Sequence, residues 1–519
     1  MENMTISYLI ERYKKWVENG NIQFLKKGTR EQTIILNFVK DLHAKIKDAD
    51  GKPGGLSKNL DWHETHISGE KLWKELISFA LRDIDVESKG NSKLFGFLSA
   101  ATDFEDILYG LDPYYRDHTL HSLWVYFIGE YILRDLIPNI YSNLNWYLFI
   151  NVDPSLREKA RDKKNSLCEK VNMRKDAVWC IVALCHDLGY SLSTLDNLND
   201  KVKKVLGFFD IPDFGKIGYS LDIEHQYLIS QFLELMAADV RIVPTGDEKD
   251  VLVKNYRDDS TYWRLCRALE KKQHGILSSY VIYKLLEMLA DTSVRGPAEE
   301  WGLDDDEAVD NIIRGDILFA VAQHEFEFAH MNQLSSLADV LFIADELEEF
   351  SRFGRPMLSR EYHDTMAESK IEFTPTNLKP GNDVEINITY YVATHGSLGD
   401  FFVRKAKRLS EIYSISATDQ ESRDFCTIKN IKMTAEKDGK KVYVQLYRDS
   451  ERNKVYLPKI KNESKEYQEK EYGLRCIDDK ILCIVDKDNE LPLLNWFEKV
   501  SDDWWKEDVQ GRIVDSKKS

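Results

Sequence analysis

The chain has 519 residues, of which 43% are hydrophobic and 11% aromatic, and its formal net charge is −17 at pH 7. A chain of this length and apolar content can bury a large core divided over roughly two to four domains. The acidic balance disfavours duplex nucleic acid as a partner, since nucleic-acid-binding proteins usually present a basic face. A small phosphorylated ligand stays open, because a local pocket can be positive in an acidic protein.

The cysteines and the N-terminus predict a cytoplasmic protein. The seven cysteines are scattered without a C-x-x-C pair, which indicates reduced thiols rather than a disulfide framework. The opening MENMTISYLIERYKKW lacks the basic start and apolar core of a secretory signal. The apolar runs WCIVALC (179–185) and VLFIA (340–344) have the size of core helices. We therefore expect no membrane partner.

Residues 1–365 carry mostly helical patterns, because apolar residues recur every three or four positions, as in YVIYKLLEMLAD (280–291). The segments 47–59 and 243–250 are predicted to be loops. The polar stretch 151–176 predicts an exposed connection or a solvated helix. We divide this part into an N-terminal helical region, residues 1–100, and a second helical domain, residues 101–365.

The pattern changes near residue 366. The predicted elements are, in chain order, a strand (383–396), an amphipathic helix (398–415), two alternating runs joined by Asp438-Gly439 (426–449) and a strand (480–488). An Asp-Gly pair between alternating runs is a hairpin signal. Residues 366–519 are therefore predicted to form a separate α+β domain, and the fold class is mainly α with this C-terminal addition.

Several predicted helices carry one imidazole or carboxylate on the apolar stripe that faces the core. His121 shares a face with Val125 and Ile128 in the segment 114–133. His274, His324 and Asp345 occupy the same kind of position in their own segments. One such histidine is more often a satisfied core residue, but several buried imidazoles and carboxylates that converge in a bundle are best satisfied by divalent metal.

The stretch WCIVALCHDLGYSL (179–192) places His186 and Asp187 side by side at the end of an apolar run. Neighbours on a helix point about 100° apart. If the helix ends beside metal ions, Asp187 can bridge two of them through its two oxygens while His186 binds one. Gly189 would then let the chain turn away.

The ordered set of His121, His186-Asp187, His274, His324 and Asp345 resembles the HD-domain metal-dependent phosphohydrolase superfamily in its binuclear subset. The resemblance covers about half the chain and implies an HD-type helical bundle. It implies two divalent ions, which could be Mn, Fe, Mg or Co. His121, His186, Asp187 and Asp345 would hold the first ion, and His274 and His324 would hold the second, with Asp187 as the bridge. The implied reaction is hydrolysis of a phosphoester or phosphodiester in a nucleotide or other small phosphorylated substrate.

Five further residues are candidates for catalysis or substrate binding near these ions. His118, one turn before the first ligand, could protonate the leaving group as a catalytic residue beside Asp187, or could be a helix cap or core residue. Arg116, Tyr190, Arg352 and Arg355 are candidates for binding substrate, although a local ion pair, a core ring and surface charges are the ordinary alternatives.

Two departures from the family pattern disfavour a cyclic dinucleotide as the substrate. Tyr190 follows the doublet where cyclic-dinucleotide-cleaving members commonly have lysine. QHEFEFAH (323–330) replaces the Gly-Tyr-Pro signature.

Two other functions share this ligand order. One is a di-iron oxygenase that oxidises a C–H bond, and the other is a non-catalytic nucleotide sensor with an HD fold. The C-terminal region would then be a regulatory, substrate-gating or dimerising module, so that a homo-oligomer is a candidate assembly.

Overall fold

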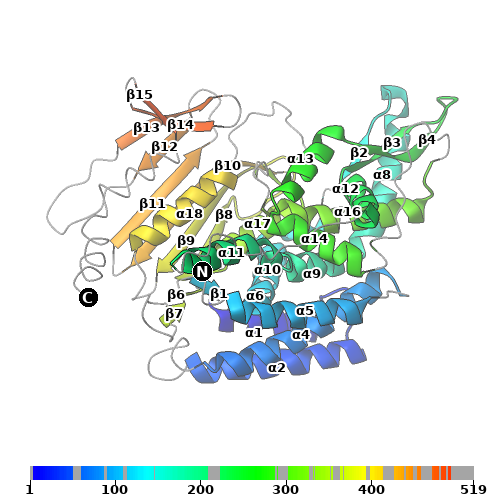
Figure 1. The fold of residues 1–519 in the computed structure, drawn as a ribbon. Coiled ribbons are helices and arrows are strands. Elements are labelled where there is room, and N and C mark those ends of the chain that lie inside the picture. The colour runs from blue at the N-terminus through cyan, green and yellow to red at the C-terminus, as the bar shows by residue number, and fades with distance from the viewer. Residues whose placement is uncertain are drawn as a thin grey trace.

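The fold combines a mainly helical N-terminal part with a C-terminal mixed sheet (Figure 1). This computed structural model describes residues 4–50, 60–86, 90–108, 114–144, 146–208, 223–286, 289, 302–325, 331, 333–350, 352–354, 363–365, 367–392, 398–412, 426–437, 440–447, 453–457, 470–477, 481–486 and 489–492. We call residues 4–350 the helical part and residues 367–492 the C-terminal part. The predicted fold class is confirmed, and the domain boundaries stay a prediction.

Helices dominate the first 350 residues. They are α1 (Ile6–Asn19), α2 (Arg30–Asp50), α4 (Trp62–Ile84), α5 (Asn91–Leu108), α6 (His118–Tyr131), α7 (Pro138–Ser142), α8 (Arg157–Asn172), α9 (Lys175–Cys185), α10 (Tyr190–Ser193), α11 (Leu195–Gly207), α12 (Ile223–Met236), α13 (Asp259–Glu270), α14 (His274–Leu285), α16 (Asp305–Gln323) and α17 (Leu337–Leu347). The polar stretch 151–176 is thus a helix, α8, in its larger part. The loop predicted at 47–59 begins later than expected, because α2 continues to Asp50, and residues 51–59 lie outside the described residues.

Side-chain caps fix where the site-bearing helices begin. Asp117 accepts a hydrogen bond from the backbone N–H of Leu120 and starts α6. Asp304 and Ser336 each complete a capping box, at the start of α16 and of α17. A cap satisfies backbone N–H groups that have no partner within the helix.

Helices α6 and α9 form the centre of the core. Every residue of α6 from Thr119 to Tyr131 is buried, as is α9 from Asp176 to Cys185. The two helices approach closely at Gly129, where an added Cβ would lie 1.8 Å from the ring of Trp179. A helix buried on all sides holds its side chains in fixed positions, and these two carry the first histidine and the His186-Asp187 doublet.

Short strands interrupt the part of the chain that was predicted to be mostly helical. They are β1 (Tyr114–Arg116), β2 (Leu148–Ile150), β3 (Ala238–Pro244), β4 (Val251–Arg257), β5 (Gln333–Leu334), β6 (Arg352–Gly354) and β7 (His363–Thr365). The sequence expectation missed all of them, including the strand that opens the segment 114–133 before its helix. The predicted loop at 243–250 joins β3 to β4, which pair antiparallel. Strand β2 pairs with β3 in parallel across about ninety residues of chain, a pairing that local pattern does not reveal.

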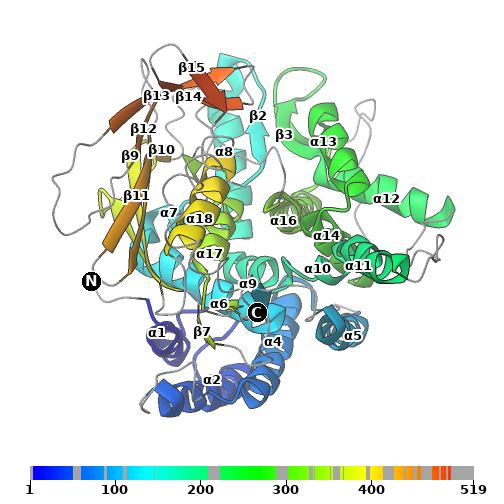
Figure 2. The ribbon, with the colours of Figure 1, turned by 60° about the vertical axis from the view of Figure 1, so that its left-hand side comes forward.

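The described residues of the C-terminal part form one large sheet and one helix. Its elements are β8 (Ala367–Thr374), β9 (Asp383–Val392), α18 (Leu398–Ile412), β10 (Cys426–Lys437), β11 (Lys440–Tyr447), β12 (Asn453–Leu457), β13 (Lys470–Ile477), β14 (Ile481–Asp486) and β15 (Asn489–Pro492). The strands follow sequence order from β8 to β15, with β9 and β10 parallel and β5 added beside β10. The hairpin prediction is confirmed, because Lys437 pairs with Lys440. Helix α18 packs between this sheet and the helical part (Figure 2).

One segment, Lys175–Leu206, is long and apolar enough to cross a membrane by length and composition. The sequence reading expected no such run. In the structure 72% of its apolar window is buried inside the protein, and residues 186–189 form a turn that interrupts the helix. The segment therefore serves as core of the helical part.

Candidate metal centre

Helix ends bring the predicted ligands to one point. His121 lies in the first turn of α6, and His274 is the first residue of α14. His186 and His324 each cap the C-terminal end of a helix, α9 and α16. Asp187 follows in the turn after α9, and Asp345 lies near the end of α17. Each side chain is thus held by a packed helix rather than by a long loop.

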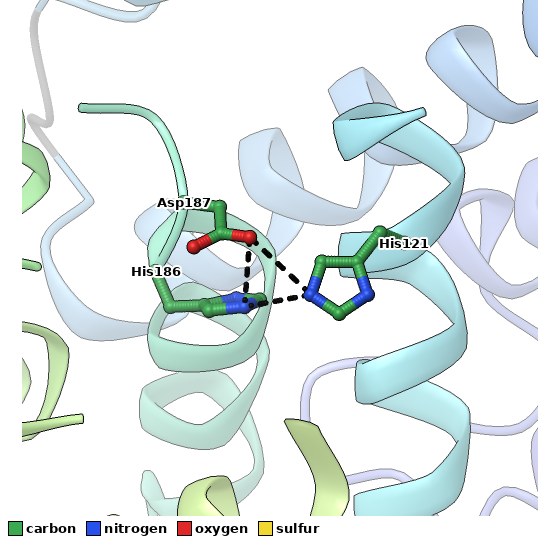
Figure 3. Close-up of side chains that lie close together, drawn as sticks. All are labelled: His121, His186 and Asp187. Carbon is green, nitrogen blue, oxygen red and sulfur yellow. Dashed lines mark hydrogen bonds and ion pairs between the residues drawn. The ribbon is translucent and has the colours of Figure 1, made fainter. Parts of the chain in front are cut away.

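The first half of the cluster consists of His121, His186, Asp187 and Asp345. The Nε2 atoms of His121 and His186 lie 3.1 Å apart (Figure 3). Oδ2 of Asp187 lies 3.3 Å from Nε2 of His121 and 3.5 Å from Nε2 of His186. Oδ1 of Asp345 is 3.1 Å from His121 Nε2. Both histidines are fully buried, and Asp187 is 7% exposed.

The second half repeats this arrangement with the other oxygen of the same aspartate. The Nε2 atoms of His274 and His324 lie 3.0 Å apart. Oδ1 of Asp187 lies 3.1 Å from Nε2 of His274 and 3.4 Å from Nε2 of His324. Each half contains three residues with the spacing of metal ligands, and Asp187 belongs to both groups.

The hydrogen bonds at Nδ1 determine which ring nitrogen is free to bind metal. Nδ1 of His121 faces the carboxylate of Glu348 at 2.7 Å, and Nδ1 of His274 faces Glu325 at 2.5 Å. Nδ1 of His186 and of His324 face the backbone carbonyls three residues earlier, at 2.8 and 2.6 Å. Carbonyls and ionised carboxylates only accept, so each Nδ1 carries a proton, and a ring that is neutral then directs the lone pair of Nε2 inward.

This geometry fits a bound cation better than it fits a metal-free core. Two Nε2 lone pairs at 3.0–3.1 Å repel each other unless a proton or a cation lies between them. For a metal–nitrogen bond of about 2.1 Å, neighbouring ligand atoms lie about 3.0 Å apart in an octahedron and about 3.4 Å apart in a tetrahedron. The observed spacings match both values. The buried cluster can therefore hold metal ions through nitrogen and oxygen ligands.

Two carboxylates behind the histidines were missed by sequence reasoning. Glu348 is fully buried against His121, and Glu325 also accepts a hydrogen bond of 2.8 Å from the backbone N–H of His274. Carboxylates in this position fix the orientation and tautomer of a metal-binding imidazole. Glu348 could have been found, because it lies three residues after Asp345 and so shares its helix face.

The pKa values differ between the two halves. Burial lowers the pKa of His186 to about 4, so this ring is neutral at pH 7. Burial also acts to lower the pKa of His274, but the charges of Glu325 and Asp187 outweigh it and raise that pKa to about 10. The surrounding imidazoles outweigh the burial of Asp187 and hold its pKa well below the usual range. Asp187 therefore remains an ionised carboxylate.

Two glycines let the helix ends approach closely. A Cβ at Gly189 would lie 2.4 Å from the backbone nitrogen of Ser278, while Gly189 itself donates to the Ser278 hydroxyl at 2.7 Å. Gly189 was expected to let the chain turn away, but its φ of −83° is open to any residue. Glycine is therefore needed at position 189 because the backbone of α14 lies so close to it. A Cβ at Gly275 would likewise lie 2.8 Å from the carbonyl oxygen of Ala322.

His118 and Tyr190 lie beside the second half of the cluster. Their rings stack with centroids 4.1 Å apart, and the ring of Tyr190 meets that of His274 edge to face at 5.8 Å. Both side chains are partly exposed. Their predicted roles in catalysis and substrate binding stay predictions.

The three candidate arginines are described only in part. The backbones of Arg116 and Arg352 are partners in the antiparallel pair of β1 and β6, directly before the helix of His121 and shortly after the helix of Asp345. Their side chains and the whole of Arg355 lie outside the described residues. Their predicted role in substrate binding stays a prediction.

A cavity of about 590 Å³ lies beside the same helices. Leu192 lines it two residues after Tyr190, and Leu277 and Val281 line it from the helix that begins with His274. Most of its wall is apolar, and Lys272 and Lys284 are the cations among its described lining residues.

Comparison of the chain with protein-family models, with curated proteins and with solved structures finds no match. The resemblance to HD-domain proteins therefore rests on the ligand order alone. The structure supports a buried His/Asp cluster with the geometry of a metal site in a helical bundle.

Proposed function

We propose that this chain is a metal-dependent phosphohydrolase with two divalent ions bridged by Asp187. The observation that supports this most directly is the orientation of the Asp187 carboxylate, since each of its oxygens faces a different pair of histidines at 3.1–3.5 Å. Asp345 adds a fourth ligand atom to the first pair. The second pair has fewer protein ligands among the described residues, which leaves positions for water and substrate.

Two bound divalent ions would lower the pKa of a water molecule and hold phosphoryl oxygens, which suits in-line displacement at phosphorus. The protein's own groups would prepare for this chemistry. Glu348 and Glu325 hold the imidazoles in the orientation that presents Nε2. The ionised Asp187 would offer one oxygen to each ion, and His118, stacked on Tyr190, would donate a proton to the leaving oxygen.

The proposed substrate is a small phosphoester with an apolar or aromatic group, such as a nucleotide. The support is the mostly apolar cavity that Leu277 and Val281 line from α14, the helix that begins with His274. A cavity of this size and lining accepts a ring better than a second phosphate. We expect a cytoplasmic enzyme, as the composition suggested.

The experiment is a reconstitution assay. Metal-free protein is loaded separately with Mn, Fe, Mg and Co and tested on mononucleotides, cyclic mononucleotides, dinucleoside phosphates and bis(p-nitrophenyl) phosphate. Release of phosphate or nitrophenol that depends on metal and is lost in Asp187→Asn supports the proposal. Metal binding without turnover on any substrate contradicts hydrolysis and favours a nucleotide sensor. Iron content with oxygen consumption on added polyols would favour a di-iron oxygenase.

A further inference from the structure

We propose that helix α18 of the C-terminal part belongs functionally to the metal centre, with Arg408 and Lys405 as positioning residues for His324 and Asp345. The inference rests on the metal-binding role proposed above. The hydrogen bonds of both side chains run to the backbone and carboxylates directly behind the ligands. No residue of the C-terminal part was predicted to take part in chemistry, so the proposal assigns this part a role at the metal centre.

The short acidic segment after Ala344 divides its side chains between two directions. Asp345 and Glu348, three residues apart, both lie within hydrogen-bond distance of His121, on either side of its ring. Glu346 and Glu349, also three residues apart, both form ion pairs with α18. Asp345 and Glu346 lie in the last turn of α17, and Glu348 and Glu349 follow directly after it, so contacts on one side of this short segment help to position the other side.

Lys405 holds this segment from the C-terminal side. Its Nζ donates to the backbone carbonyl oxygen of Glu346 at 2.7 Å and lies 3.1 Å from the Glu346 carboxylate and 2.7 Å from that of Glu349. The residue is only 4% exposed, and Glu349 is fully buried. Tyr390, from the large sheet, donates to the same carbonyl at 2.6 Å. The peptide that follows Asp345 is therefore fixed by two groups of the C-terminal part.

Arg408 connects the two halves of the metal centre. Its Nε donates to the carboxylate of Glu346 at 2.9 Å, and a terminal nitrogen donates to the backbone carbonyl of His324 at 3.0 Å. Glu346 adjoins a ligand of the first half, and His324 is itself a ligand of the second. A planar guanidinium can hold two acceptors at a set separation, whereas a lysine ammonium offers no such fixed fork.

The ordinary alternative is that these ion pairs only join the sheet to the helices. Such a role would change stability but not the cation sites. A positioning role predicts a loss of metal affinity in folded protein, because outer residues that orient ligands typically change metal affinity about 10–100-fold when they are removed.

The test measures metal binding by the folded full-length chain, without an activity assay. Metal-free wild type, Arg408→Gln and Arg408→Lys are titrated with Co²⁺ against a chelating dye, and the visible absorption of bound Co²⁺ is recorded. Lys429→Gln is the matched control, since it removes a cation from an exposed ion pair in the same part of the chain. We expect Arg408→Gln to bind at least one ion about 10–100-fold more weakly and with a changed spectrum. The Co²⁺ affinity of Arg408→Lys should lie between those of wild type and Arg408→Gln. The affinity and spectrum of Lys429→Gln should equal those of wild type.

Wild-type affinity and spectrum in folded Arg408→Gln would overturn the inference while leaving the metal centre intact. If that variant does not fold, Arg408→Lys decides, and unchanged affinity there overturns the inference as well. A wild-type protein that binds no Co²⁺ would contradict the proposed function itself, and with it this inference. The parallel wild-type titration therefore separates the two failures.

Discussion

The two halves of the metal centre share Asp187 but differ in their surroundings. In the first half His121 and Glu348 are both fully buried, and His186 is neutral at pH 7. In the second half the side chains of His274 and Glu325 are 18% and 31% exposed, and the pKa of His274 is about 10. The ring of His274 also meets Tyr190, which stacks on His118.

The difference between the two halves suggests that the two ions have different roles. The first half has two fully buried histidines, and no proton must leave His186 before a cation binds. The second half is more open, has fewer described protein ligands, and must release a proton from His274. We therefore expect the first ion to be held more tightly and the second to face the substrate.

Asp187→Asn should have the largest effect, because the substitution removes the charge that both halves share. We expect it to bind neither ion tightly and to lose metal-dependent hydrolysis at least about a hundredfold. Metal analysis after gel filtration and the phosphoesterase assay measure this. Asp316→Asn is the control, since Asp316 is a buried aspartate of α16 outside the cluster whose pKa burial raises well above its usual value. Two retained ions in Asp187→Asn would rule out the bridge.

His121→Ala and His274→Ala should differ in stability as well as in metal content. Each should lose the ion of its own half. His121→Ala also removes a hydrogen-bond partner from the fully buried Glu348, which should cost about 1–3 kcal/mol in the free energy of unfolding. Glu325, the partner of His274, can be reached by water. Urea unfolding with a chelator present measures the difference, and equal losses would contradict the comparison.

The second ion should bind more tightly as pH rises, and the first should change less. A metal must displace the proton of His274, whose raised pKa of about 10 keeps the ring charged below that pH. Between pH 6 and 8 the affinity of the second ion should rise by up to about a hundredfold. The ring of His186 is already neutral above its pKa of about 4. Calorimetric titrations at pH 6 and pH 8 measure both affinities. If the two affinities change equally with pH, the proposed difference between the two halves is contradicted.

Tyr190→Ala should have the smallest effect and leave both ions in place. It removes the ring that stacks on His118, a contact worth about 0.5–1.5 kcal/mol, so kcat/KM should fall by roughly two- to tenfold. Tyr227→Ala, which removes an exposed tyrosine of α12, is the control. Loss of metal in Tyr190→Ala would mean that the ring supports the cluster rather than the substrate.

The ligand set could be predicted because helix periodicity exposes it. His121 and Asp345 stand on apolar stripes, and a polar residue there requires a partner. The pairing of the rings came only from the family resemblance and not from periodicity, since it depends on how α9, α14 and α16 meet. The role of Glu325 could not be predicted either. It follows His324 in the sequence, yet it accepts a hydrogen bond from the backbone of His274, about fifty positions away.

The fold was predictable where local pattern decides it. The hairpin of β10 and β11 carries an Asp-Gly signal, and α18 is amphipathic. Strands β3 and β4 were missed inside a region read as helical, although VLVKNYR (251–257) has the composition of a strand. The docking of Arg408 on His324 spans 84 residues and follows from packing that no local signal encodes.

The central claim is that the four histidines and Asp187 bind a pair of cations. Its most direct test is calorimetric titration of metal-free wild-type protein with Mn²⁺ at pH 8. The account predicts two equivalents per chain in two separable steps, the first tighter than the second. A single equivalent would contradict the bridging role of Asp187, and no binding would contradict the metal centre altogether.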